Sequence, residues 1–316
     1  MRLDEELQGI GSVGIAGHIR PDGDCVGSCL SVYNYITTYF PQIDVDVILE
    51  PIPTIFHFLQ GAHEIKEAHE VKKDYDLFLV LDCGDANRLG DAVAFFENAK
   101  RTICIDHHVS NQSFADKNHI VPSASSTCEL VYGVLDANKI TKEIAECIYT
   151  GMVHDTGVFQ YSCTAKSTME IAGVLMEKGI DYPSIIDKTF YEKTYAQNRI
   201  LGQALLKSRL YEEAKCIATV ITQEEMAEFG VLPKHLDGIV NQLRVTKDVE
   251  VAIFLYGLEE GSYKVSTRCK GDVVDLSKIA VKYHGGGHKK AAGFTMEGNN
   301  PWELVDRIVS DVKEQL

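Results

Sequence analysis

The chain has 316 residues, which is enough for two ordinary domains that each bury a core. Hydrophobic residues make up 45% and charged residues 24%, the balance of a soluble globular protein, and no stretch approaches the roughly 20 apolar residues that a membrane span needs. The net charge of −15 argues against broad attraction to long duplex nucleic acid or to an anionic membrane, although it is compatible with a small anionic substrate.

The N-terminus and the cysteines bear on the compartment. The first residues carry acids before an apolar run and lead directly into a motif, so they do not resemble a signal peptide. The nine cysteines form no CxxC pair, and several lie in apolar runs, where a reduced cysteine acts as a small hydrophobe. We therefore expect a reducing compartment and a cytoplasmic location.

The first half of the chain alternates short apolar runs with helical segments. The predicted strands are 13–16, 45–49, 77–81 and 102–105, and the predicted helices include 26–40 and 129–138. Ser126 and Glu129 have the spacing of a capping box at the start of the second helix. This alternation predicts an α/β fold in which helices cover a parallel sheet.

The second half begins with a largely helical stretch and then alternates again. Helices are expected from 141 to 209, with breaks at 164–165 and 179–183. The later predicted strands are 215–221, 249–255 and 262–267, and the later predicted helices are 235–245, 276–283 and 301–315. We expect an N-terminal parallel-sheet domain at 1–190, a linker helix at 191–207 and a smaller α/β C-terminal domain at 208–316.

Acids and histidines follow the predicted N-terminal strands at the points where these strands end. The candidates are His18, Asp22, Asp24, Asp82, Asp106, His107 and His108, with Asp155 at the end of a later helical run. Any one of them alone would more often be a surface histidine, a turn residue or a helix cap. The carboxyl ends of parallel strands meet at one edge, however, and so many acids together are costly unless they are paired or bind metal.

Aspartate and histidine ligands without cysteine suit Mn²⁺, Mg²⁺, Fe²⁺ or Zn²⁺, and the share of imidazole favours Mn²⁺. Four aspartates and two histidines are enough for two ions bridged by one carboxylate. Two ions about 3.5–4 Å apart can stabilise both the attacking and the leaving oxygen of an in-line displacement at phosphorus. The charges of four aspartates and two divalent ions cancel, so a substrate phosphate needs cationic help from elsewhere.

That help is expected from the C-terminal half, where the interval 264–290 holds seven lysines and arginines against two aspartates. A glycine run lets the backbone approach an anion closely, although such a run is often only a flexible loop. The phosphate-binding candidates are Gly285, Gly286, Gly287, His288 and Lys289. Arg268 ends a predicted strand and could bind phosphate with its planar guanidinium, or it could be an ordinary surface arginine.

Together, these motifs resemble the DHH phosphoesterase family over nearly the whole chain. The matching segments are 18–24 (His-x₃-Asp-Gly-Asp), Asp82 with 84–90, 106–108 (Asp-His-His), 155–157 (Asp-Thr-Gly), and 285–288 (Gly-Gly-Gly-His) with Arg268. Each motif is short, but in this order and spacing the set is highly specific.

The resemblance implies a role for each matching residue. One metal ion would be bound by His18, Asp22 and Asp82, and the other by Asp24, Asp82, His107 and Asp155, so that Asp82 bridges the two. His108 would face the scissile phosphate, and Asp106 would orient the histidines. Arg268 and the glycine segment would hold the other end of the substrate across an interdomain cleft.

Within the family, the chain resembles the compact NrnA-type oligoribonucleases. Pyrophosphatases of the family lack the glycine motif, membrane-anchored cyclic dinucleotide phosphodiesterases carry long additional segments, and RecJ-type exonucleases need another domain. The resemblance implies hydrolysis of short RNA to nucleoside 5′-monophosphates, and of 3′-phosphoadenosine 5′-phosphate (pAp) to AMP and phosphate. The alternatives are a phosphodiesterase for pApA or cyclic di-AMP and a nucleotide-binding regulator without catalysis. Gln160 stands where this subgroup is expected to have arginine, and a homodimer is left open.

Overall fold

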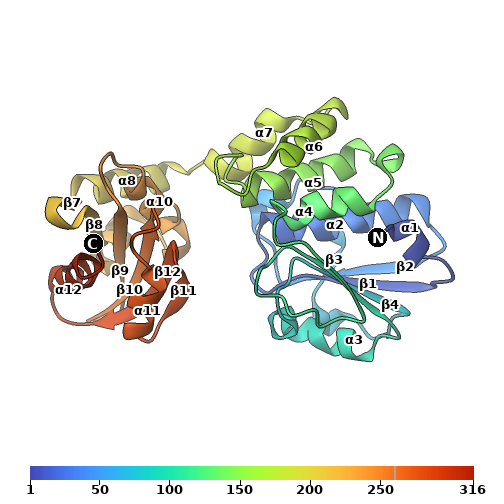
Figure 1. Ribbon diagram of the computed structural model, residues 1–316, viewed down its shortest axis with the longest axis horizontal. Helices are drawn as coiled ribbons and strands as arrows, with labels where there is room; N and C mark the ends of the chain where they lie inside the picture. The colour runs from blue at the N-terminus through green and yellow to red at the C-terminus, as the bar shows by residue number, and fades with distance from the viewer. Residues whose placement is uncertain (260) are drawn as a thin grey trace. The chain divides into compact units, whose positions relative to one another are not determined.

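The computed structural model describes residues 1–259 and 261–316. The chain forms two compact units, Met1–Glu192 and Lys193–Leu316, and each contains a six-stranded sheet with helices around it (Figure 1). The predicted α/β class is therefore confirmed. Among the described residues, no helix combines the length and the apolarity that crossing a bilayer would require.

The sheet of the N-terminal unit is parallel throughout and has the strand order β3-β2-β1-β4-β5-β6. Its strands are β1 (Ser12–Ala16), β2 (Asp44–Ile48), β3 (Ile65–Lys66), β4 (Leu77–Leu81), β5 (Thr102–Asp106) and β6 (Lys117–Ile120). The order reverses between β1 and β4, and ligands of open α/β sheets bind at the carboxyl ends of the strands at such a point. The segment that begins with His18 and the residue Asp82 follow these two strands.

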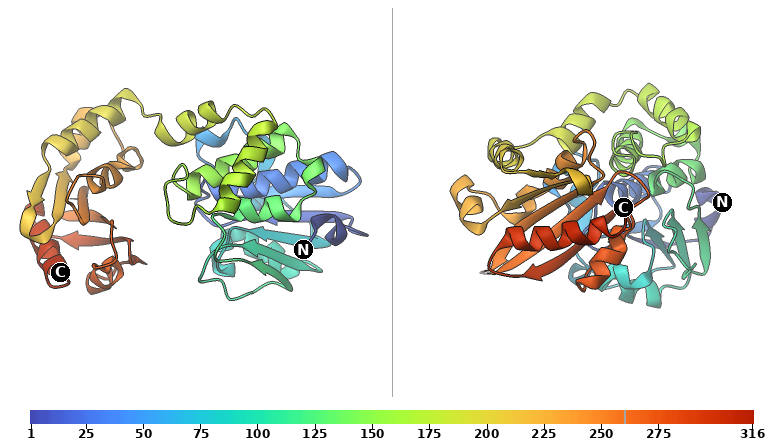
Figure 2. Two further views of the ribbon diagram at one scale, coloured as in Figure 1. Left: turned by 45° about the horizontal axis from the view of Figure 1, so that its top comes forward. Right: turned by 60° about the vertical axis from the view of Figure 1, so that its left-hand side comes forward.

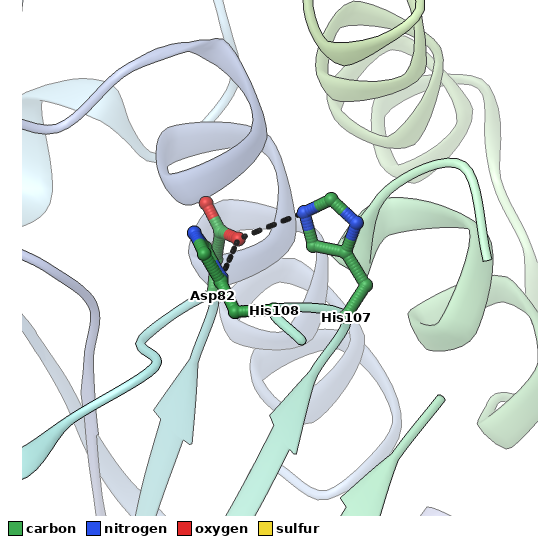
Figure 3. Close-up of side chains that lie close together, drawn as sticks. All are labelled: Asp82, His107 and His108. Atoms are coloured by element: carbon green, nitrogen blue, oxygen red, sulfur yellow. Dashed lines mark ion pairs between the residues drawn. The ribbon is translucent and has the colours of Figure 1, made fainter. Parts of the chain in front are cut away.

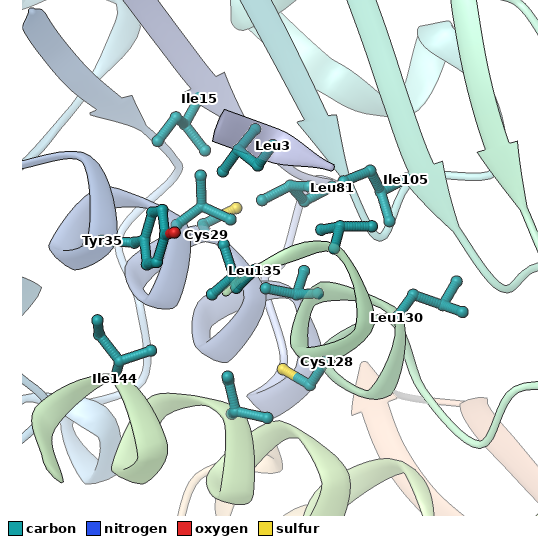
Figure 4. Close-up of a cluster of buried hydrophobic side chains, with 14 of the residues drawn as sticks. Leu3, Ile15, Cys29, Tyr35, Leu81, Ile105, Cys128, Leu130, Leu135 and Ile144 are labelled. Atoms are coloured by element: carbon teal, nitrogen blue, oxygen red, sulfur yellow. The ribbon is translucent and has the colours of Figure 1, made fainter. Parts of the chain in front are cut away.

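Helices cover both faces of this sheet (Figure 1). They are α1 (Leu3–Glu6), α2 (Gly23–Tyr39), α3 (Val93–Asn98), α4 (Thr127–Val134), α5 (Lys142–Asp155), α6 (Lys166–Glu177) and α7 (Tyr182–Ile186). Alternate side chains of β4 enter different cores: Leu79 and Leu81 pack with residues of α2, α4 and α5 (Figure 4), whereas Phe78 and Val80 pack on the face that α3 covers. This period of two explains why β4 is apolar at every position, as the sequence predicts for a strand buried on both sides.

Short 3₁₀ turns and one π-helical turn join the longer elements of this unit. The 3₁₀ turns are η1 (Thr54–Phe56), η2 (Ala62–Glu64), η3 (Ala68–Glu70), η4 (Ala86–Ala92) and η5 (Ala137–Lys139), and the π-helical turn is η6 (Asp187–Tyr191). Four of them, η1 to η4, lie between β2 and α3. The connections from β2 to α3 therefore contain no long helix, and η3 and η4 follow the carboxyl ends of β3 and β4.

The sheet of the C-terminal unit is mixed, with the order β11-β12-β10-β9-β8-β7, and only β8 and β9 pair in parallel. Its strands are β7 (Arg209–Tyr211), β8 (Cys216–Ile221), β9 (Val251–Glu259), β10 (Ser262–Cys269), β11 (Gly286–His288) and β12 (Ala291–Glu297). Its helices and turns are α8 (Tyr195–Leu206), η7 (Glu212–Ala214), α9 (Gln223–Phe229), η8 (Pro233–Leu236), α10 (Ile239–Arg244), α11 (Leu276–Lys282) and α12 (Pro301–Lys313). Residues of α11 and α12 pack on one face, and residues of α8, α9 and α10 on the other (Figure 2).

Two local predictions are corrected by the structure. The single helix predicted at 235–245 is wrong, because Gly238 adopts a left-handed φ of 87° and separates η8 from α10. Only one of the two hydrogen bonds of the predicted capping box forms at the start of α4. The Ser126 hydroxyl accepts the Glu129 N–H at 3.0 Å, but the Glu129 carboxylate turns away and accepts the Ser125 hydroxyl at 2.5 Å.

Candidate metal centre

Asp82 lies immediately after β4, where the strand order reverses. Its side chain is buried, and its backbone has a left-handed φ of 55°, a conformation that costs about 1–3 kcal/mol in a non-glycine residue and recurs at active sites as well as in turns. Oδ2 lies 3.5 Å from Nε2 of His18, and Oδ1 lies 3.7 Å from Nε2 of His107 and 3.6 Å from Nδ1 of His108 (Figure 3). Because its two oxygens face different histidines, Asp82 is placed to bridge two cations.

The first group of potential ligand atoms comes from the segment that follows β1. His18, Asp22 and Asp82 each offer an atom, and these atoms lie within 4.8 Å of one another. Nδ1 of His18 lies 2.8 Å from the carbonyl of Ile19, which leaves Nε2 directed toward the two carboxylates. Asp22 caps α2 by accepting the N–H groups of residues 24 and 25, so one of its oxygens is fixed at the start of this helix.

The second group joins three segments that are distant in the sequence. Atoms of Asp24, His107 and Asp155 lie within 4.8 Å of one another, and Nε2 of His107 is 3.0 Å from Oδ2 of Asp155. The buried carboxylate of Asp24 accepts the backbone N–H groups of Thr127 at 2.6 Å and Cys128 at 2.9 Å, at the N-terminus of α4. The first turn of α4 therefore holds Asp24 in place.

The charges in this centre are unbalanced without cations. Burial, followed by the neighbouring charges of Asp82 and Asp155, raises the pKa of Asp24 well above its ordinary value. Burial opposes protonation of His107, but its hydrogen bond to Asp155 and the charge of Asp24 raise its pKa to about 10. Burial also opposes protonation of His18, yet hydrogen bonds to Asp22 and Asp82 raise its pKa to about 11. Protons thus occupy positions that divalent cations could take, and the ligand set fits two such ions.

His108 is oriented by the carboxylate at the end of β5. Its Nδ1 lies 2.7 Å from Oδ1 of Asp106, whose Oδ2 accepts the side-chain amide of Asn111 at 2.7 Å. The hydrogen bond to Asp106 raises the pKa of His108, against the opposing effect of burial. The Asp106 side chain is fully buried, whereas 31% of the His108 side chain is exposed. His108 therefore reaches the surface, while its hydrogen bond to the buried Asp106 fixes the orientation of its ring.

His154 precedes Asp155 in the sequence and has no role in the predicted site, but it packs against the turn that carries Asp22 and Asp24. A β-carbon added to Gly23 would lie only 2.4 Å from Cγ of His154, so the glycine permits the close approach. The His154 ring makes edge contacts with Phe56 and Phe190, and burial lowers its pKa to about 4. The only sequence signal was its position before Asp155, which does not reveal such packing.

Gln160 follows a strained turn. Gly157, Val158 and Phe159 all have left-handed φ angles of 55–62°, an unusual conformation for a β-branched residue. The Thr156 hydroxyl holds the turn by accepting the Phe159 N–H at 2.9 Å. Gln160 is exposed just after this turn, and its expected effect on substrate contacts stays a prediction.

The C-terminal candidates lie together on the second sheet, although the glycines do not form the expected loop. Gly286 and Gly287 belong to the edge strand β11, and β-carbons on Gly285 or Gly287 would clash with β12. Arg268 pairs with Ala291, and Ala291 pairs with His288, so these residues share one row across the sheet. Lys289 follows this row and lies 3.9 Å from Asp272. One edge of β11 is left available to a ligand, as at any edge strand.

All nine cysteines are unpaired, and eight of them are buried. Several surround the centre: Sγ of Cys25 lies 3.8 Å from the carbonyl of His18, and Sγ of Cys128 lies 3.7 Å from that of Asp24. Burial raises the pKa of both thiols well above the ordinary value. These cysteines therefore pack as small apolar groups beneath the centre rather than adding thiolate ligands.

Comparisons with known proteins match both halves of the chain. A model of the DHH family N-terminal domain matches residues 12–152, and a DHHA1 domain model matches residues 213–316. A bifunctional oligoribonuclease and PAP phosphatase NrnA of Thermus thermophilus is 29% identical over 97% of this chain and 90% of its own length. The protein of the same name from Bacillus subtilis is 25% identical over 94% and 92%. An exopolyphosphatase-related protein from Bacteroides fragilis has a crystal structure that is 26% identical, with a TM-score of 0.89 over 99% of this chain and 95% of that one.

Proposed function

Because the chain belongs to the DHH family, we propose that it is a two-metal phosphoesterase that hydrolyses short oligoribonucleotides to nucleoside 5′-monophosphates and pAp to AMP. The observation that carries this proposal is the placement of Asp82 between two groups of carboxylates and histidines at the switch point of a parallel sheet. The names of the NrnA relatives support the substrate class.

We assign His18, Asp22 and Asp82 to one cation, and Asp24, Asp82, His107 and Asp155 to the other. Two divalent ions held there supply Lewis acidity for an attacking water and for the phosphoryl oxygens. Mn²⁺ is our preferred ion, because histidines make up a third of the ligands. The fixed positions of Asp24 and Asp22 at helix N-termini keep the ligands in place before substrate binds.

His108 is proposed to contact the scissile phosphate. Asp106 accepts the Nδ1 proton, and the raised pKa of His108 favours the imidazolium, so Nε2 can donate to a phosphoryl oxygen as negative charge builds there. Asp106 contributes by orientation and is a positioning residue. The second unit is proposed to bind another phosphate of the substrate through Arg268, Lys289 and the glycine segment.

Mn²⁺-dependent turnover should be measured on a 5′-labelled RNA dimer, trimer and 24-mer, on pAp, pApA and cyclic di-AMP, and on pyrophosphate. The double variant Asp82→Ala/His107→Ala serves as the blank. We expect preference for the short RNAs and pAp over the 24-mer. Cleavage confined to pApA or cyclic di-AMP would favour second-messenger turnover instead, and no Mn²⁺-dependent cleavage of any of these compounds would overturn the proposal.

The role of the second unit can be tested with two neighbouring lysines. Lys289→Ala should raise KM for pAp about tenfold and leave kcat nearly unchanged, because a charged hydrogen bond to phosphate contributes about 1.5–3 kcal/mol. Lys290→Ala is the matched control, since Lys290 also lies near Asp272, at 3.3 Å, but was not assigned to the substrate. Equal effects of the two substitutions would argue against a specific contact.

The cytoplasmic location and a homodimer stay predictions.

A further inference from the structure

A cavity of about 130 Å³ lies beside the metal centre within the N-terminal unit. A single water needs only about 10–15 Å³ of such space, so the cavity has room for a much larger group. Its wall comes from the segment after β1, the end of β2, the turn η3 and the turn η4. All four segments lie at the carboxyl edge of the sheet, where ligands of such folds bind.

The cavity combines an apolar floor with acceptors of hydrogen bonds. Its lining includes the buried apolar residues Ile48, Leu49 and Leu89. The acidic residues among its lining are Glu50, Glu67 and Asp91, and the histidines are His18 and His69. No lysine or arginine is among its lining residues, all of which the structure describes. A phosphate would be repelled here, whereas a flat, largely apolar group that donates N–H hydrogen bonds would fit the chemistry.

His18 connects this cavity to the site of hydrolysis. It lines the cavity, and its Nε2 lies 3.5 Å from Oδ2 of Asp82. A group in the cavity would therefore lie next to a ligand of the proposed ions. If those ions hold the phosphate of a nucleotide substrate, the nucleoside attached to that phosphate would lie beside them and could enter the cavity.

We propose that this cavity binds a nucleobase of the substrate and selects bases with an exocyclic amino group, namely adenine, cytosine or guanine. Carboxylates accept hydrogen bonds from such amino groups, whereas uracil offers only its ring N3–H and carries carbonyl oxygens that a carboxylate repels. This inference rests on the proposed function and adds a base preference to it. It gives the N-terminal unit a role in substrate selection besides the chemistry.

Glu50 is held in position for this role. Its Oε2 accepts the backbone N–H of Arg20 at 2.7 Å. The opposite wall is equally constrained: Gly90 has a φ of 56°, and a β-carbon there would lie 2.7 Å from Cγ2 of Ile19. The Ile19 N–H donates to the carbonyl of Arg88 at 2.7 Å. A preformed pocket with a fixed acceptor loses little entropy when a base binds.

The first test is Glu50→Gln, with kcat/KM measured for the dinucleotides ApA and UpU. Glutamine can still accept the Arg20 N–H, so the local fold is preserved, but its amide can also donate to a uracil carbonyl. We expect the ApA to UpU ratio to fall about tenfold, the effect of one hydrogen bond to a charged group. Glu64→Gln, in the turn η2 outside the cavity, should leave the ratio unchanged.

A second test fills the cavity. Ala68 lines it, is partly exposed and lies at the margin of the core beneath α3, so the larger side chain of Ala68→Phe should occupy the cavity. The variant should lose at least about tenfold in kcat/KM for pAp, the order of effect of one well-packed aromatic contact. Hydrolysis of ribose 3′,5′-bisphosphate, which has no base, should not change.

The outcomes distinguish this inference from the proposed function. If the wild-type protein cleaves neither the dinucleotides nor pAp, the proposed function fails. If it cleaves them and both variants keep the wild-type ratios, only the base site is overturned. A lower Mn²⁺ content in Glu50→Gln would also overturn the base site, because the carboxylate would then act through the ions.

Discussion

Two sets of carboxylates in the N-terminal unit differ in what neutralises them. Asp46 on β2 is surrounded by donors: Lys66 at 2.5 Å, Lys73 at 2.6 Å and the Tyr75 hydroxyl at 2.7 Å. Burial alone would raise the pKa of Asp46, but these hydrogen bonds lower it. Asp24 and Asp155, by contrast, have raised pKa values, chiefly because of burial. Within the N-terminal unit, the groups beside their carboxylates are the His107 ring and, for Asp24, backbone N–H groups.

The difference in partners distinguishes a carboxylate with a structural role, Asp46, from carboxylates proposed to bind metal. A buried carboxylate is stable when the fold supplies its own cations, as it does for Asp46. In the described part of the chain, no lysine pairs with the carboxylates around Asp82. Potential ligand atoms in each group lie within 4.8 Å of one another, an arrangement that external cations can stabilise. The raised pKa values of Asp24 and Asp155 mark carboxylates for which the described residues supply no lysine, whereas the lowered value of Asp46 marks a completed ion pair. Asp22 in the same cluster differs, because burial opposes its ionisation but its hydrogen bond to His18 lowers its pKa.

The largest effect is expected from Asp82→Asn, which keeps the shape but removes the charge shared by both groups. Activity should fall at least about a thousandfold, because Asp82 is proposed to hold both ions, and their Lewis acidity would contribute several kcal/mol to the transition state. Steady-state turnover of pAp and metal content per chain would be measured together. Asp44→Asn, on the exposed start of β2, is the control, and an Asp82 variant within tenfold of wild type would contradict the assignment.

The second prediction concerns stability. Mn²⁺ at about one hundred times its Kd should stabilise the chelated protein by about 2.7 kcal/mol, because the cations bind only the folded chain. Denaturant unfolding with and without Mn²⁺ measures this gain. Asp46→Asn should gain as much as wild type and Asp82→Asn far less; equal gains in all three would place the stabilising ions elsewhere.

The third prediction is that Asp106→Asn lowers kcat about 10–100-fold with unchanged metal content, the usual effect of losing an orienting partner. The amide can no longer favour the His108 imidazolium, so the alkaline limb of the pH profile of kcat, where His108 loses its proton, should also move to lower pH. Asp85→Asn is the control, because Asp85 also lies just after β4, where it caps the turn η4. A wild-type pH profile for Asp106→Asn would show that His108 does not depend on this carboxylate.

Much of this arrangement is visible in the sequence, because it depends on local patterns. The strand at 77–81 and the end of the strand at 102–106 follow from apolar runs, and a parallel sheet must bring the residues after such strands to one edge. The grouping of Asp82, His107 and His108 is therefore predictable. Asp82 and His107 are proposed as metal ligands, and His108 as a contact to the substrate.

The remaining features depend on contacts between distant residues. The N–H groups of Thr127 and Cys128 reach Asp24 across more than 100 residues, and no spacing rule encodes that. The glycine segment became an edge strand because β12 approaches it too closely for a side chain. Similarly, neither the cavity beside His18 nor the packing of His154 leaves a periodic pattern in the chain. Tertiary packing determines these features, so local sequence signals do not reveal them.

The smallest expected effect is that of Asp46→Asn on stability. The folded pKa of Asp46 is lower than its unfolded value of about 3.9, so its ionised form stabilises the fold above that pH, and this contribution is lost as the pH falls through the folded pKa. The variant should lose about 1 kcal/mol at pH 7, since its lysine partners are partly exposed, and less at pH 3. Urea unfolding at both pH values tests this. An equal loss at both would mean that hydrogen-bond geometry, rather than charge, accounts for the effect, and the contrast with the Asp82 cluster would weaken.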